Sequence, residues 1–199
     1  MLDWLRKEDV VVDFWRWFER NADRIRTGVE RQDHGVIVHE LGRRIAKAKP
    51  GVMHEIGKPD SETVELILSA DGIKANIPNV LALMAKAPKL QGFLFTAFRP
   101  RHPGMVLHIA DQEVSADQIR YVAEPAGRVL NLRVFVDGEW TDRERAMAGF
   151  LLLDQVLGEY DVMTGLGSIA FEAAASPPEA LPLEALAAEF DAFRAATSH

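Results

Sequence analysis

The same order of elements occurs twice along this chain: a strand-like run, an Asp-Gly turn, a helical stretch and a second strand-like run. The first copy runs from Val64 through Asp71-Gly72 to a strand at 93–98, and the second from Val129 through Asp137-Gly138 to a strand at 161–171. Asp and Gly are favoured in tight turns at strand ends. This order predicts an α+β fold with a mixed or antiparallel sheet, helices packed mainly on one side and ferredoxin-like elements. Sequence identity between the copies is slight. Both an internal duplication and an origin without duplication therefore remain open.

Hydrophobic periodicity predicts the remaining elements. Apolar residues three and four apart predict a helix over 11–25 that buries Phe14, Trp15 and Phe18, and a second helix over 34–48. Trp17 lies off this stripe, and it either packs under a neighbouring element or anchors an interface. Alternation predicts two hairpins and a further strand, at 52–56 with 63–68, at 93–98 with 105–109, and at 119–124. Gly165 and Gly167 predict a bulge in the 161–171 strand.

The 199-residue chain is long enough to bury a core without disulfides, and one α+β domain over residues 1–175 is expected. A short linker, Ser176-Pro177-Pro178, leads to an amphipathic helix over 179–197 that carries Leu183, Leu186, Phe190 and Phe193 in phase. An isolated helix of this length is marginal in water, so its apolar stripe must be buried. We expect it to dock on its own domain. The alternative is docking on a second copy of the chain, in a homodimer.

Composition limits the classes of partner. The chain has no cysteine, which excludes disulfides, thiolate metal sites and a cysteine nucleophile. The net charge is −7, and nucleic acid is not expected as a partner because it normally requires a concentrated basic surface. The N-terminus lacks the apolar core of a signal peptide, and no apolar run approaches the ~18 residues that span a bilayer. A cytoplasmic location without membrane contact is therefore expected.

The spacings typical of catalytic and metal sites do not occur in the sequence. His39-Glu40 and His54-Glu55 lack the second histidine of a helical zinc site, and there is no Gly-x-Ser-x-Gly nucleophile elbow. Both Asp-Gly pairs lack the alternating acidic ligands of a calcium loop. We therefore predict no catalytic residue, no metal and no cofactor.

The candidate ligand-binding residues are polar side chains on the predicted strands and at their ends. Glu55 and Glu65 lie on the first hairpin, Arg99 and Arg101 follow the 93–98 strand, and His108 lies near the end of the next. On an open sheet face, the glutamates and arginines would form a mixed-charge groove for a polar ligand or a peptide. The alternative is a set of solvated cross-strand ion pairs that contribute little to stability.

Several short motifs are spread over about residues 13–172. They are Phe14-Trp15-Arg16-Trp17-Phe18-Glu19-Arg20-Asn21, His54-Glu55-Ile56-Gly57, Ala87-Pro88-Lys89-Leu90, Ala97-Phe98-Arg99-Pro100 and Leu157-Gly158-Glu159-Tyr160-Asp161-Val162. Together they resemble a family of uncharacterised bacterial proteins with a domain of unknown function and an opening Phe-Trp-x-Trp-Phe motif. This resemblance implies the extent of the domain and no activity. Residues 159–172 are also similar to the closing helix and strand of the ferredoxin-like type B regulators of ribonuclease E, which implies a binding role.

Two functions follow as expectations. The missing catalytic spacings, the acidic balance and the sheet-plus-helix plan favour a non-catalytic cytoplasmic module that binds or regulates another protein. The alternative is an enzyme or a binder of small polar ligands that uses the mixed-charge groove. A concave pocket around the five candidate residues would favour the alternative, and a flat, solvated sheet face would favour the module.

Overall fold

The computed structural model describes residues 9–31, 34–109 and 112–197. The chain divides into two compact units, residues 1–98 and residues 99–199. The region expected to form one domain, 1–175, therefore spans both units. Each unit combines helices with a mixed sheet, which confirms the predicted α+β class.

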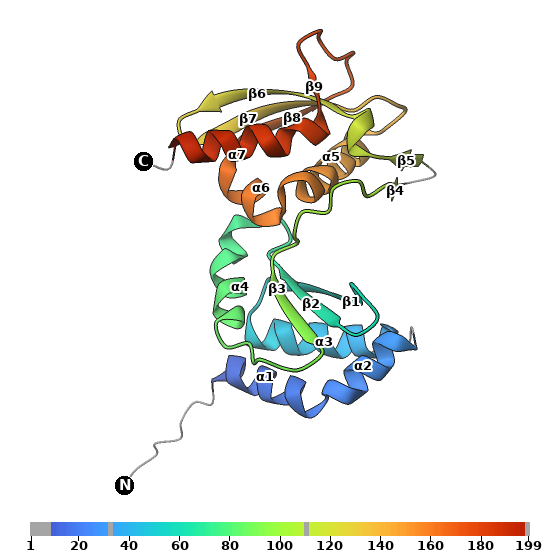
Figure 1. Ribbon diagram of the computed structural model, residues 1–199, viewed down its shortest axis with the longest axis vertical. Coiled ribbons are helices and arrows are strands. Elements are labelled where there is room, and N and C mark those ends of the chain that lie inside the picture. Colours follow the sequence, from blue (N-terminus) through green and yellow to red (C-terminus); the bar gives the residue numbers. More distant parts are fainter. Residues whose placement is uncertain (1–8, 32–33, 110–111, 198–199) are drawn as a thin grey trace. The chain divides into compact units, whose positions relative to one another are not determined.

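The first unit is a three-stranded sheet with α1, α2 and α3 gathered on one side (Figure 1). Its elements are α1 (Val10–Arg20), α2 (Ala22–Glu30), α3 (His34–Ala48), β1 (Met53–Gly57), β2 (Val64–Ser69), the 3-10 turn η1 (Lys74–Asn76), α4 (Ile77–Met84) and β3 (Phe93–Ala97). β1 pairs antiparallel with β2, and β2 pairs parallel with β3. η1 and α4 form the long connection that a parallel pair requires. The predicted first hairpin and the predicted helix over 34–48 are confirmed.

An aromatic cluster holds α1 against the sheet. Phe14, Trp15 and Phe18 are buried, which confirms the predicted core residues of this helix. Trp15 and Phe18 contact Phe95 of β3 edge-on, with ring centroids 4.8 and 5.2 Å apart. The indole Nε1 of Trp15 also donates a 2.8 Å hydrogen bond to the carbonyl of Leu83 in α4. One side chain thus joins α1, α4 and the sheet.

Trp17 packs under a neighbouring element, the first of the two interpretations above. It is buried, and the guanidinium carbon of Arg44 in α3 lies 4.1 Å from its ring centroid. The predicted continuous helix over 11–25 is wrong, because α1 ends at Arg20 and α2 begins at Ala22. Asn21 leaves helical geometry there, and its side-chain amide donates a 2.8 Å hydrogen bond to the carbonyl of Trp17, in competition with the regular helix pattern.

The described part of the second unit contains a four-stranded sheet, a two-stranded hairpin and three α-helices. Its elements are β4 (Leu107–Ile109), β5 (Gln112–Val114), η2 (Ala116–Gln118), β6 (Arg120–Ala126), β7 (Val129–Phe135), α5 (Asp142–Leu157), α6 (Glu159–Gly165), β8 (Leu166–Glu172), β9 (Leu181–Pro182), η3 (Leu183–Ala185) and α7 (Leu186–Thr197). The sheet order is β8-β7-β6-β9, and only the β7–β8 pair is parallel.

The core of the second unit lies between one sheet face and the helices. Leu130, Leu132 and Val134 alternate along β7 and are buried against side chains of α5, such as Leu152. α7 places Leu186 and Phe190 in the same core. The C-terminal helix thus packs on the rest of the second unit, to which it belongs.

The two units share one plan of strand pairing. In each, an antiparallel hairpin is followed by an Asp-Gly turn, a helical connection and a strand parallel to the hairpin's second strand. Gly72 and Gly138 adopt φ of 69° and 119°, a region that glycine enters without strain. Asp71 adopts a φ of 55°, and aspartate is one of the residue types that tolerate this region. The repeat of element order is therefore also a repeat of topology. The outer edges differ: β6 pairs with β9, whereas β1 has no outer neighbour among the described residues.

The predicted hairpin of 93–98 with 105–109 is wrong. β3 pairs only with β2 among the described residues, and β4 pairs with β5. The strand β3 ends because Phe98 adopts a φ of 64°, while its N–H donates a 2.8 Å hydrogen bond to the carbonyl of Leu68. The chain then leaves the first unit instead of folding back beside β3.

The predicted strand over 161–171 is wrong in its first half, where the residues form α6. Gly158, with a φ of 82°, ends α5, and the acidic residues Glu159 and Asp161 in the next turn suit a helix N-terminus. The bulge is confirmed, because the register of β7 and β8 shifts between Leu130 and Leu132, opposite Gly167.

The predicted helix over 179–197 is shorter than expected, because α7 begins at Leu186. Leu181 and Pro182 instead form β9, which pairs with β6, and a 3-10 turn follows. Pro182 favours this extended geometry because its ring fixes φ near −65°.

Candidate functional site

One face of the three-stranded sheet in the first unit is left open by the helices, and it carries both predicted glutamates. Side chains alternate across a sheet, so one face holds Val64, Leu66 and Leu68, which are buried. The register places seven side chains on the opposite face, of which Ser69, opposite Met53, is buried. The other six are those of Met53, Glu55, Glu65, Ile67, Leu94 and Thr96. We call this set the open face.

An apolar row crosses the open face diagonally. In the register, Glu55 lies opposite Ile67, and Glu65 lies opposite Leu94, so Met53 and Leu94 are the diagonal neighbours of Ile67 on the two outer strands. The side chain of Met53 is 52% exposed and that of Leu94 is 47% exposed, whereas Ile67 is half-buried. The three strands therefore present a continuous apolar strip to solvent.

The two glutamates lie together on the β1 side of this strip. Glu65 is opposite Gly57, and a Cβ built on Gly57 would meet no atom within 4 Å. The glycine therefore leaves open space beside it on this face. The carboxylate of Glu65 accepts a short hydrogen bond from Thr96 Oγ1 of β3, the strand on the other side of β2 from Gly57. We call Glu55 and Glu65 the acidic corner of the open face.

His54, next to Glu55 in sequence, belongs to the opposite face and takes no part in this corner. It packs against α3, where a Cβ on Gly42 would lie 3.2 Å from its Cε1. Burial lowers the pKa of His54 below its ordinary value, although a hydrogen bond with the backbone of Val38 and the charge of Glu55 act in the other direction. At neutral pH this imidazole is therefore uncharged and serves packing.

Arg101 lies at the corner between α5 and α6 in the second unit, where it joins three segments. Its Nε donates a 2.8 Å hydrogen bond to the carbonyl of Leu157, and Nη2 donates one of 3.0 Å to Asp161. Nη1 and Nη2 also bind the two carboxylate oxygens of Asp191 in α7 at 2.9 and 2.8 Å. These bonds, those to Asp191 foremost, raise the pKa of Arg101 further above its ordinary value. The guanidinium thus clamps α5, α6 and α7 together.

Arg99 strengthens the same corner. Its backbone N–H donates a 3.0 Å hydrogen bond to the carboxylate of Glu159, and its carbonyl accepts one of 3.0 Å from the N–H of Glu159. Glu159 is fully buried, so its charge requires such partners, and the Arg99 guanidinium lies 4.0 Å away. The Arg99 guanidinium is also 3.9 Å from Asp154. Both arginines are therefore structural parts of the second unit.

His108 lies on the β4–β5 hairpin. Its Nδ1 is 3.5 Å from a carboxylate oxygen of Glu113 directly across the hairpin, and both side chains are well exposed. A pair of this kind contributes little to stability.

The five predicted site residues thus form three local groups. Glu55 and Glu65 share the open face, Arg99 and Arg101 share the α5–α6 corner, and His108 pairs on its own hairpin. The glutamates belong to the first unit, and the arginines and His108 belong to the second, so the mixed-charge groove that would join them stays a prediction. We take the open face as the candidate site within the first unit.

We expect Arg101→Gln to lower the free energy of unfolding by about 1–3 kcal/mol, because it removes charged hydrogen bonds at a partly exposed position. A double-mutant cycle with Asp191→Asn in urea should give a coupling energy of about 1 kcal/mol. Arg143→Gln, at an exposed position of α5, is the matched control, with an expected change below ~0.5 kcal/mol. Strictly additive effects of the first two substitutions would show that the pair of Arg101 and Asp191 contributes nothing to stability.

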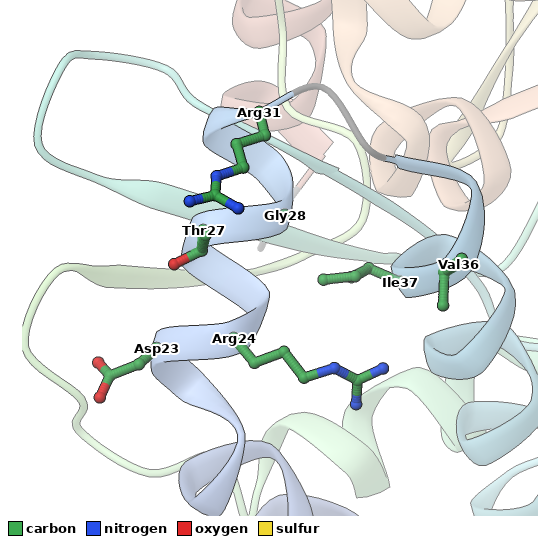
Figure 2. A pocket seen from close by; sticks show the side chains of 7 residues that line it. All are labelled: Asp23, Arg24, Thr27, Gly28, Arg31, Val36 and Ile37. Carbon is green, nitrogen blue, oxygen red and sulfur yellow. The ribbon is translucent and has the colours of Figure 1, made fainter.

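A hollow of about 390 Å³ between α2 and α3 is a rival site in the first unit. It is lined by Asp23, Arg24, Thr27, Gly28, Arg31, Val36 and Ile37 (Figure 2). Figure 2 shows Arg24 extending from α2 toward α3, whereas Asp23 points away from α3. Arg24 Nη2 already lies 2.9 Å from Glu40. The charged groups of this hollow do not converge on one point, so it is weaker as a site than the open face.

The two glutamates are among the residues predicted from the sequence, whereas the apolar half of the open face is not. Met53 and Leu94 alternate with side chains that face the helices, such as Val52 and Phe95, and that alternation was the available signal. Among the described residues, no group of three or more His, Asp or Glu side chains is placed to hold a metal ion. None of the helices that the structure describes has the length and apolar character needed to cross a bilayer.

Comparison with known proteins adds no relative to this geometry. No protein-family model matches the sequence, and neither the curated proteins nor the solved structures include a significant match.

Proposed function

We propose that this chain is a non-catalytic cytoplasmic module that binds or regulates another protein, and that the open face is its binding surface. The observation that carries the proposal is the apolar strip of Met53, Ile67 and Leu94 beside two carboxylates on an otherwise well-packed sheet. Exposed apolar side chains that adjoin each other and are bordered by polar ones are typical of protein interaction sites.

The shape of this surface supports a macromolecular partner over a small ligand. Small-molecule sites are concave and bury most of their ligand. The open face is instead the surface of a three-stranded sheet, formed by alternate side chains of the three strands. The resemblance of residues 159–172 to type B regulators of ribonuclease E points to the same class of role, through the second unit.

The proposal is tested by affinity capture from the organism that encodes the chain, using the full-length protein and two double variants. Met53→Ser with Leu94→Ser alters the open face. Met147→Ser with Leu151→Ser alters exposed positions of α5 in the second unit and is the matched control. All four residues are exposed, so both variants should fold, which circular dichroism verifies.

The expected result is one stoichiometric partner whose affinity falls by about tenfold or more for the open-face variant and is unchanged for the control, since interface anchors typically contribute more than 1 kcal/mol each. A partner lost by the α5 variant instead would move the binding surface to the second unit. If no partner is captured and a metabolite raises the melting temperature by several degrees in a thermal-shift screen, the alternative function, an enzyme or small-ligand binder, replaces the proposal.

A further inference from the structure

The strand β3 lies at one edge of the sheet in the first unit, and a hollow of about 470 Å³ lies beside it. Residues 87–91, in the connection from α4 to β3, form the opposite wall of this hollow (Figure 1). Phe93 and Phe95 contact α1 on the helix side of the sheet, and Leu94 belongs to the open face, yet all three line the hollow. The hollow therefore follows the outer edge of the strand itself. We call it the β3 groove.

The backbone of β3 has hydrogen-bonding groups to spare along this edge. The N–H of Val64 donates to the carbonyl of Gly92, and the N–H of Phe98 donates to the carbonyl of Leu68. Alternate residues of a strand face its parallel neighbour, so the even-numbered residues of β3 face β2 and Phe95 turns its N–H and C=O to the outer edge. No hydrogen bond joins these two groups to a residue that the structure describes. Free edge groups of this kind accept an added strand.

The walls of the groove are largely apolar. Five of the side chains that line it are half-buried or exposed, namely those of Met84, Leu90, Phe93, Leu94 and Phe95. Both phenylalanine rings contact α1 on one side, so their positions are fixed before any partner binds. An apolar side chain placed in the groove would remove this surface from water.

The charges at the groove are positive. Lys89 lines the groove and is exposed. Arg26 of α2 lies beside it, where its Nη2 donates a 3.1 Å hydrogen bond to the carbonyl of Gln91 and its guanidinium carbon is 5.2 Å from the ring centroid of Phe93. Among the described residues, no Asp or Glu lines the groove, and no carboxylate forms a salt bridge with Lys89 or Arg26. In a chain of net charge −7, two such cations at one apolar groove select an acidic occupant.

We propose that the β3 groove receives an extended acidic segment of the partner protein, which pairs with the free edge of β3. Its apolar side chains contact Phe93 and Phe95, and its carboxylates lie beside Lys89 and Arg26. Both cations are at the end where β3 begins, so the acidic residues come at one end of the segment and the apolar residues follow along the strand. This inference rests on the proposed function and makes it more specific, since Leu94 belongs to both the open face and the groove.

Two capped peptides test this inference on the full-length chain. Glu-Glu-Leu-Val-Leu suits parallel addition to β3 and Leu-Val-Leu-Glu-Glu suits antiparallel addition, each flanked by Thr. One control replaces both glutamates by lysine, and the other is an eight-nucleotide oligothymidylate, because cations beside aromatic rings also suit single-stranded nucleic acid. Calorimetry measures the affinity, and amide NMR shifts locate the contacts.

At least one acidic peptide should bind at least tenfold more tightly than both controls and should shift the amides of β3. No binding by either acidic peptide, or binding no tighter than that of a control, would overturn the inference. The proposed function is judged separately, because a captured partner that is lost by the Met53/Leu94 variant would support it whatever the peptides do.

Strand pairing has its own signature, because only alternate N–H groups of an added strand face β3. Two N-methylated versions of the better peptide, methylated at odd or at even residues, remove one set of N–H donors each. One version should lose binding at least tenfold and the other should retain it. Equal binding by both would overturn the inference, because a segment that only fills the groove has no such asymmetry.

Charge variants test the role of the two cations. Arg26→Gln with Lys89→Gln should weaken the acidic peptide about tenfold or more, and Arg26→Lys alone should retain most of the affinity because it keeps the charge. Arg16→Gln with Lys74→Gln removes two exposed cations elsewhere in the first unit and is the matched control. Equal weakening by the two double variants would overturn the inference, since it would reflect net charge alone.

A filled groove tests the location. Ala87 lines the groove and Ala85 does not, although both lie in the connection after α4. Ala87→Trp should abolish binding of the acidic peptide, whereas Ala85→Trp, at an exposed position, should leave the affinity unchanged. Circular dichroism verifies that both variants fold. Undiminished binding by a folded Ala87→Trp variant would overturn the inference.

Discussion

Replacing Trp15 by alanine should destabilise the first unit by about 3–5 kcal/mol, the usual cost of deleting a large buried aromatic side chain. Trp15 is 3% exposed, and its ring contacts Phe14 and Phe95 edge-on at centroid distances of 4.8 Å. The variant also leaves the carbonyl of Leu83 without the indole donor. Urea unfolding followed by circular dichroism measures the loss, and hydrogen exchange at the amides of β2 and β3 assigns it to the first unit.

Two further variants separate the causes of this loss. Trp15→Phe keeps most of the ring volume and removes the donor to Leu83, so it should cost about 1–3 kcal/mol. Val10→Ala, at an exposed position of the same helix, should change the free energy of unfolding by less than ~0.5 kcal/mol. A loss below 1 kcal/mol for Trp15→Ala would contradict the aromatic cluster as the contact that holds α1, and Trp15 would become an interface candidate.

The elements that could be predicted are those whose signal is local. The alternation around Glu55 and Glu65 defines the β1–β2 hairpin, and the apolar spacing over 34–48 defines α3, because each pattern records which side chains face the core. The plan of strand, Asp-Gly turn, helix and strand was also visible, since turn chemistry requires particular residues at fixed places.

The errors arise where a local pattern fits two structures. Residues 161–165 are short and apolar enough for a strand, but the break at Gly158 and the acidic first turn make them a helix of seven residues with Glu159 and Tyr160. Strand pairing is a non-local choice. β3 lies beside β2, some thirty residues away, and the sequence of β3 does not encode that partner.

The candidate site was predictable only in part, for the same reason. Alternation places Glu55 and Glu65 on one face, and that part of the prediction is confirmed by the register. The role of Arg101 depends on Asp191, 90 residues later in the chain, so no local pattern could show that its guanidinium is engaged. A long-range ion pair of this kind is set by the fold and not by the neighbouring residues.

The second large effect concerns the C-terminal helix. Phe190→Ala should destabilise the second unit by about 3–5 kcal/mol, because this ring is 1% exposed and lies among the core residues, next to Gly165. A Cβ on Gly165 would come within 2.2 Å of the ring, so glycine is what allows α6 and α7 to approach this closely. The matched control is Phe150→Ala on α5, where the ring is 46% exposed and the expected loss is below ~1.5 kcal/mol.

The same variant decides whether the helix docks on its own chain. α7 packs on its own unit, where Tyr121 Oη also donates a 2.5 Å hydrogen bond to Glu189. The unfolding midpoint of wild type and of Phe190→Ala should therefore not depend on protein concentration, and sedimentation velocity should give both the same mass. A midpoint that rises with concentration in the wild type, together with a loss of dimer in Phe190→Ala, would show that the helix is exchanged between two copies. A variant with unchanged stability and unchanged mass would contradict both forms of docking, because neither leaves Phe190 exposed to solvent.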